Sequence, residues 1–72
     1  MDYSTKIMDL RDKAIRTHRI INKLEDILIL APEKFTPEMA VLLDHYNAKL
    51  TTIKAEKAHL EIERALSIER SI

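Results

Sequence analysis

Glu56 and His59 are the residues whose types and spacing come nearest to metal chemistry in this sequence. A Glu-x-x-His spacing places a carboxylate and an imidazole on one face of a helix, and carboxylate-bridged dimetal bundles use two copies of it with further inward-facing glutamates. This sequence has one copy, and its first half offers Asp9 and Asp12 at the same level. We therefore expect no metal and no cofactor, and we predict a surface row of Glu56, His59 and Glu63 that contributes roughly tenths of a kcal/mol.

The other two histidines, His18 and His45, have no histidine four residues away along the chain. No serine or threonine stands beside a base and an acid in the arrangement that nucleophilic catalysis needs. A protein of two helices also offers no concave pocket of its own. We therefore expect a protein that is not an enzyme and has no catalytic residues.

Basic residues follow one stripe of the first half of the chain, at Arg16, Arg19 and Lys23. A basic stripe can bind phosphates, but Asp12 interrupts this one and the net charge of the chain is +0, so no overall field recruits nucleic acid. We expect a solvated helix face that pairs with carboxylates of the second half, and no direct nucleic-acid binding.

Length and composition further limit the folds and binding sites that the chain can form. With 72 residues it is at most one small domain, residues 1–72, and it is 46% hydrophobic with no glycine and no cysteine. Without glycine, phosphate-binding loops and tight hairpin turns are disfavoured, and without cysteine there is no disulfide or thiolate zinc site. The longest apolar run, residues 27–31, is far shorter than the roughly 20 residues of a membrane span. With no signal peptide at the amino terminus, we expect a cytoplasmic protein that does not insert into membranes.

One break divides the chain almost in half. Pro32 lacks the amide hydrogen that a continuing helix needs. Thr36 can cap a second helix, Pro37 suits its first position, and Glu38 places a negative charge in its first turn. These signals predict a helix over about residues 2–31, a loop over 32–36 and a helix over about 37–70.

Apolar residues recur three and four residues apart in both halves, which is the spacing of a coiled-coil seam. In the first helix the seam is Ile7, Leu10, Ala14, Thr17, Ile21, Leu24, Leu28 and Ala31. In the second it is Met39, Leu43, Tyr46, Leu50 and Ile53, followed after a five-residue step by Ala58, Ile62 and Ala65, so the apolar face rotates partway along. The pattern predicts an all-α fold, an antiparallel two-helix hairpin with Leu10 near Leu60. Two helices splayed apart in an intertwined dimer fit the same pattern.

More apolar residues are present than two facing stripes can bury, and the surplus gathers around the loop. A helix that is hydrophobic all round is normally buried all round. We therefore expect the hairpin to be completed by self-association or by a protein partner, bound through helix-in-groove burial. The predicted partner-binding residues are Ile27, Ile29, Leu30, Phe35, Met39, Val41 and Leu42.

The layout as a whole resembles a known family. The chain has a first helix with an alanine and leucine seam, a short break at Pro32–Thr36 and a longer second helix, all within about seventy residues. This layout resembles the small E-component co-chaperones of type III secretion needles (the YscE/PscE kind). The resemblance covers nearly the whole chain and lies in its length, hairpin layout and apolar pattern. It implies a cytosolic hairpin that binds a helical-repeat chaperone and helps keep the needle subunit unpolymerised before export.

Other classes of helical binding protein remain open. The stretches 21–28 and 39–41 resemble helical segments of the Hha/YmoA family of nucleoid-protein modulators, although no break separates later short helices as in that family. Needle subunits are also helical hairpins with a proline-containing loop. The stretch 56–70 of this chain is highly charged, whereas a polymer-forming helix would need more apolar surface there. A phage-encoded inhibitor that blocks a host protein with a helical face has no common sequence signature and stays open as well.

Overall fold

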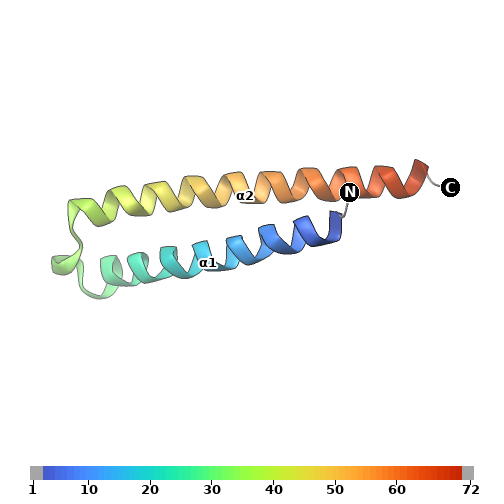
Figure 1. Ribbon diagram of the computed structural model, residues 1–72. Coiled ribbons are helices and arrows are strands. Elements are labelled where there is room, and N and C mark those ends of the chain that lie inside the picture. Colours follow the sequence, from blue (N-terminus) through green and yellow to red (C-terminus); the bar gives the residue numbers. More distant parts are fainter. Residues whose placement is uncertain (1–2, 71–72) are drawn as a thin grey trace.

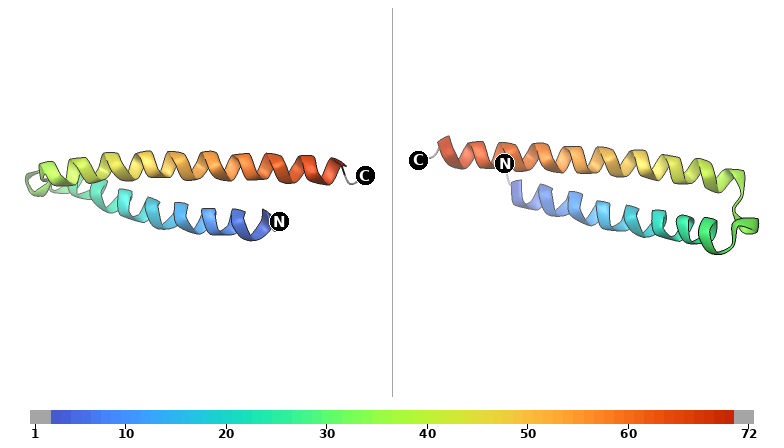
Figure 2. Two further views of the ribbon diagram at one scale, coloured as in Figure 1. Left: turned by 45° about the horizontal axis from the view of Figure 1, so that its top comes forward. Right: turned by 180° about the vertical axis from the view of Figure 1, so that it is seen from behind.

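The computed structural model describes residues 3–70, with side chains through residue 68. Two α-helices, α1 (Tyr3–Leu30) and α2 (Pro37–Arg70), are joined across a short 3₁₀ turn, η1 (Pro32–Lys34). The helices run antiparallel and side by side, and α2 continues past the start of α1 (Figure 1). Figure 2 shows the same arrangement from two further sides. The molecule is a rod with extents of 59 × 16 × 14 Å. The predicted all-α antiparallel hairpin is confirmed, and the chain folds back on itself instead of splaying.

Pro32 ends the first helix. The Ala31 amide still donates to the Ile27 carbonyl (2.9 Å), but proline has no N–H with which to continue the ladder. Helix α1 therefore ends at Leu30, one residue before the predicted end, and the predicted start at residue 2 lies outside the described residues. The loop contains the single turn η1, which is closed by hydrogen bonds from the amides of Lys34 and Phe35 to the carbonyls of Ala31 and Pro32 (2.9 and 3.1 Å).

Thr36 starts the second helix as its N-cap. The amide of Met39 donates to the Thr36 hydroxyl oxygen (3.2 Å), which gives a partner to one of the amides that the first turn leaves free. Pro37 is the first helical residue and Glu38 lies in the first turn. The predicted start of the second helix and its capping chemistry are confirmed.

A narrow seam between the helices forms the core. The buried apolar residues are Leu10, Ile21, Leu24, Leu50 and Ile53. Thr17 is buried with them, and its hydroxyl donates to the carbonyl of Lys13 (2.8 Å), so no polar group is left without a partner there. No side chain that the structure describes has less than 2% of its surface exposed, so even the seam remains partly open to solvent.

The seam departs from the predicted one near the loop. Leu28 was expected in the seam but is 43% exposed, whereas its neighbour Ile27 is half-buried. On a straight helix with 3.6 residues per turn, Leu28 would lie directly in line with Leu10. The burial of Ile27 in its place shows that the side of α1 that faces α2 shifts around the helix toward the loop.

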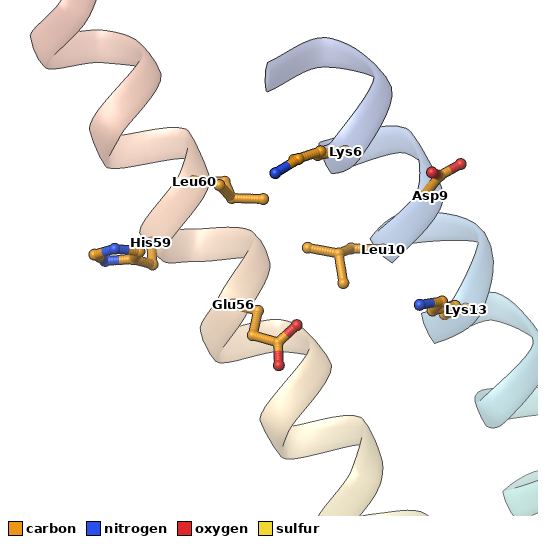
Figure 3. A pocket seen from close by; sticks show the side chains of 7 residues that line it. All are labelled: Lys6, Asp9, Leu10, Lys13, Glu56, His59 and Leu60. Atoms are coloured by element: carbon orange, nitrogen blue, oxygen red, sulfur yellow. The ribbon is translucent and has the colours of Figure 1, made fainter. Parts of the chain in front are cut away.

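The seam also departs from the prediction along the second half of α2. The predicted five-residue step is wrong, because the seam continues from Ile53 in steps of four, three and three residues, through half-buried Lys57, Leu60 and Glu63. The residues that the step placed in the seam are exposed: Ala58, Ile62 and Ala65. Leu60 does lie across from Leu10, as predicted, and the two side chains point toward each other (Figure 3). The aliphatic stem of Lys57 lies along the seam while its ammonium reaches Glu61 (3.5 Å).

The position of Lys57 generates a stability prediction. The Lys57→Leu variant should raise the free energy of unfolding by about 1 kcal/mol, since leucine buries apolar surface at a seam position and loses only a surface ion pair. Lys54→Leu makes the same chemical change at an exposed position and should alter it by less than about 0.5 kcal/mol. Urea unfolding followed by circular dichroism measures both. Equal effects of the two substitutions would contradict the seam through Lys57.

Candidate protein-binding surface at the loop end

The loop end of the hairpin carries a group of exposed apolar side chains. Of the seven predicted partner-binding residues, four are exposed: Ile29 (72%), Leu30 (80%), Val41 (69%) and Leu42 (45%). The other three are half-buried: Ile27, Phe35 and Met39. Leu28, which the prediction placed in the seam, is exposed beside them. We call Leu28, Ile29, Leu30, Val41 and Leu42 the loop-end surface.

The proline break brings these residues together from the two helices. The last turn of α1 supplies Leu28, Ile29 and Leu30, and the early turns of α2 supply Val41 and Leu42. Because α2 starts only a few residues after Pro32, the two helices meet at this end of the rod (Figure 1). Ile27 and Met39 are half-buried, so they add less exposed area to this end of the rod than the residues of the loop-end surface do.

The charges around the loop-end surface are mostly negative. Between residues 25 and 44 the chain has five carboxylates, on Glu25, Asp26, Glu33, Glu38 and Asp44, and one ammonium, on Lys34. The stretch from Lys6 to Lys23 has the opposite excess, with six basic and two acidic residues. The zero net charge of the chain therefore conceals an acidic loop end and a basic half of α1.

The Glu-x-x-His motif does not bring its two side chains together. The Glu56 carboxylate turns toward α1, whereas the His59 imidazole points to the other side of α2 (Figure 3). His59 Nε2 is 2.8 Å from Glu63 Oε1, so that half of the predicted surface row is confirmed. Within residues 3–68, whose side chains are described, no three His, Asp or Glu residues are grouped so that they could hold a metal ion.

The basic stripe of α1 is exposed, as predicted, but its expected pairing with α2 is not formed. In the part of the chain that the structure describes, the ion pairs are Lys57–Glu61 and His59–Glu63, both within α2. Lys6 and Lys13 share a shallow groove with Glu56 across the helices without joining it in an ion pair (Figure 3). Neither helix, over the described residues, has a stretch long and apolar enough to cross a membrane.

The sequence pattern did not single out a second group of exposed apolar residues on α2. Ile62, Leu66 and Ile68 are 60%, 45% and 54% exposed. The predicted five-residue step placed Ile62 in the seam, so its exposure to solvent was not expected. The signal that could have revealed it is the unbroken heptad through Leu50, Ile53 and Leu60.

Matched substitutions test whether the loop-end surface is open in the free chain. Leu30→Gln should change the free energy of unfolding by less than about 0.5 kcal/mol, because the side chain is already in water. Leu24→Gln, on the same helix, should cost about 2 kcal/mol or more, because it buries an amide in the seam. Urea unfolding at low protein concentration compares them. A similar loss for both would mean that Leu30 is covered within the isolated hairpin.

Comparison of the chain with models of protein families, with curated proteins and with solved structures found no match.

Proposed function

We propose that this protein is a non-enzymatic binding protein that inserts its loop-end surface into an apolar groove of a helical partner. The observation that carries the proposal is the set of large apolar side chains at the hairpin tip, with Leu30 exposed to 80% and Ile29 to 72%. Exposed apolar patches of this kind mark interaction sites. Leu28, Ile29 and Leu30 are consecutive residues, so their side chains surround the last turn of α1. Val41 and Leu42 add exposed apolar area from the second helix.

Burial of this surface would provide substantial binding energy. Full burial of one exposed leucine or isoleucine contributes about 1.5–3 kcal/mol. Association costs about 4–15 kcal/mol in lost translational and rotational freedom, so several anchors must be buried together. The rigid helices already hold the five residues of the loop-end surface in place, and little further ordering is needed.

The acidic residues around the surface favour a partner of complementary charge. Five carboxylates and one ammonium lie between residues 25 and 44. A groove with an apolar floor and a basic rim would match both features, and the charges would fix the register in which the hairpin docks.

The specific form of this proposal is a cytoplasmic co-chaperone. It binds a helical-repeat chaperone and helps keep a secretion-needle subunit soluble before export. Two features support it: the resemblance of the hairpin layout to the needle co-chaperones, and a tip whose apolar anchors and acidic rim suit the groove of a helical-repeat protein. A modulator of a nucleoid DNA-binding protein or a structural subunit would use the same kind of surface. Affinity capture distinguishes these two alternatives from the co-chaperone.

Affinity capture from native lysate with the tagged wild-type chain tests the proposal. We expect it to retain a helical-repeat protein together with a small secreted subunit, identified by mass spectrometry. The Leu30→Lys variant should lose both, because it removes an anchor and places a positive charge against a basic rim. Lysine also suits the C-terminal turn of a helix, so folding should be preserved.

Met8→Lys is the matched control, because Met8 is exposed on α1 far from the loop. It should retain the partners at the wild-type level. Capture of a DNA-binding oligomer instead would replace the co-chaperone with the nucleoid modulator. Equal capture by Leu30→Lys and the wild type would refute the loop-end surface as the binding site.

A further inference from the structure

One side of the hairpin is hollowed into an open groove between α1 and α2. Two adjoining hollows, of about 350 and 610 Å³, share Leu10, Lys13 and Glu56 in their linings, so they form one continuous groove. The groove runs along residues 6–20 of α1 and residues 46–60 of α2. At about 1.5 Å per residue, both stretches are about 21 Å long.

Basic side chains line both walls of the larger hollow. Lys13 and Arg16 belong to α1 and Lys49 to α2, and all three are exposed. Among the residues that the structure describes, the carboxylate in this lining is that of Glu56, and none of the three basic groups takes part in an ion pair. A cleft lined by one sign of charge attracts groups of the opposite sign. The larger hollow therefore suits a ligand that carries negative charge.

The smaller hollow has a mixed charge. It adds Lys6 and Asp9 to the groove, and the Lys6 side chain reaches toward α2 (Figure 3). Over both hollows the described lining residues include four Lys and Arg side chains and two carboxylates, so the excess of positive charge lies at the larger hollow. We call the whole groove, along residues 6–20 and 46–60, the basic groove.

The floor of the basic groove is mainly apolar. Leu10 and Ile53 are buried there, Tyr46 and Leu60 are half-buried, and Ile20 lies exposed beside them. A nucleic-acid strand is charged along its whole backbone, so it would meet the basic walls and leave this floor without an apolar partner. A ligand that combines apolar side chains with carboxylates matches both the floor and the walls.

We propose that the basic groove binds an amphipathic helix of a partner protein, whose apolar stripe is flanked by carboxylates. The space between two antiparallel helices is where a third helix packs in a helical bundle. A helix of about 14 residues, or about four turns, has the length of the groove. Its apolar stripe covers the floor, while its flanking carboxylates face Lys13 and Arg16 on one wall and Lys49 on the other.

This inference goes beyond the proposed function, because the basic groove and the loop-end surface are different parts of the hairpin. None of the five residues of the loop-end surface lines the groove. The two sites also select opposite charges in a partner, since the loop end is acidic and the groove is basic. One hairpin can therefore hold two different helical partners.

Peptide binding to the full chain tests the proposal. The probe is a fluorescently labelled peptide of about 14 residues, with leucines at helical spacing and glutamates on both flanks. The control peptide has lysines in place of the glutamates. In fluorescence anisotropy we expect the wild type to bind the glutamate peptide at least about tenfold more tightly than the lysine peptide. Equal binding of the two peptides, or no binding of the glutamate peptide, would overturn the proposal.

A charge reversal tests the walls of the groove. Arg16→Glu should weaken binding of the glutamate peptide at least about tenfold, because it places a carboxylate against the carboxylates of the ligand. Arg19→Glu is the matched control, since Arg19 is exposed on the same helix but does not line the groove, and the change in net charge is the same. It should weaken binding by less than about threefold, because salt screens distant charges. Equal losses for the two variants would contradict binding in the groove.

A matched pair of isoleucines tests the apolar contribution. Ile20 lines the groove and is 38% exposed, whereas Ile15 is 41% exposed on α1 and does not line it. Ile20→Gln should weaken binding of the glutamate peptide about fivefold or more, and Ile15→Gln should leave it unchanged. Loss of binding in neither variant would contradict an apolar floor contact. A single-stranded oligonucleotide that displaces the peptide and binds the Ile20→Gln variant as tightly as the wild type would assign the groove to nucleic acid and overturn the proposal.

Discussion

The packing of α1 against α2 along a single seam is the interaction on which the rest of the structure depends. Leu10, Ile21 and Leu24 meet Leu50 and Ile53 there, and these residues are the apolar core of the described chain. A helix in a two-helix hairpin can turn only one stripe toward its neighbour, so the remaining apolar residues stay in water however well the seam packs. Small cores of this size are marginal unless something else covers them.

The most exposed of the uncovered apolar residues gather at the loop-end surface, where Leu30 is exposed to 80%, Ile29 to 72% and Val41 to 69%. Other exposed apolar residues, such as Met8, Ile15 and Ile62, are spread along the rod. The loop-end surface is rimmed by carboxylates and borne on two helix ends, which suits insertion into the groove of another protein.

The sequence predicted the helix ends well because their causes are local. Pro32 has no amide hydrogen and Thr36 supplies a capping hydroxyl, and both act within a turn of the boundary that they set. The exposure of Leu30 and Val41 was predictable for a related reason, since consecutive apolar residues around the loop cannot all face one neighbour.

The side of the helix that faces the seam was harder to predict. Near the loop, residues 27 to 31 are all apolar, so the pattern alone could not decide between Ile27 and Leu28, and the slow drift of the seam around the helix decided it. The expectation that charged residues lie outside the seam was wrong at Lys57. A long aliphatic stem can lie in a seam while its ammonium group remains in water. Both departures depend on how the two helices wind about each other, which a single helix's pattern does not contain.

The central claim is that the seam alone does not complete this protein. The most direct test is the midpoint of thermal unfolding, followed by far-ultraviolet circular dichroism over a wide range of protein concentrations. If a second copy covers the exposed apolar residues of the hairpin, the midpoint should rise steadily with concentration, because association stabilises the folded chain by mass action. A midpoint that stays the same at every concentration, with a sharp transition of a fully helical single chain, would contradict the account.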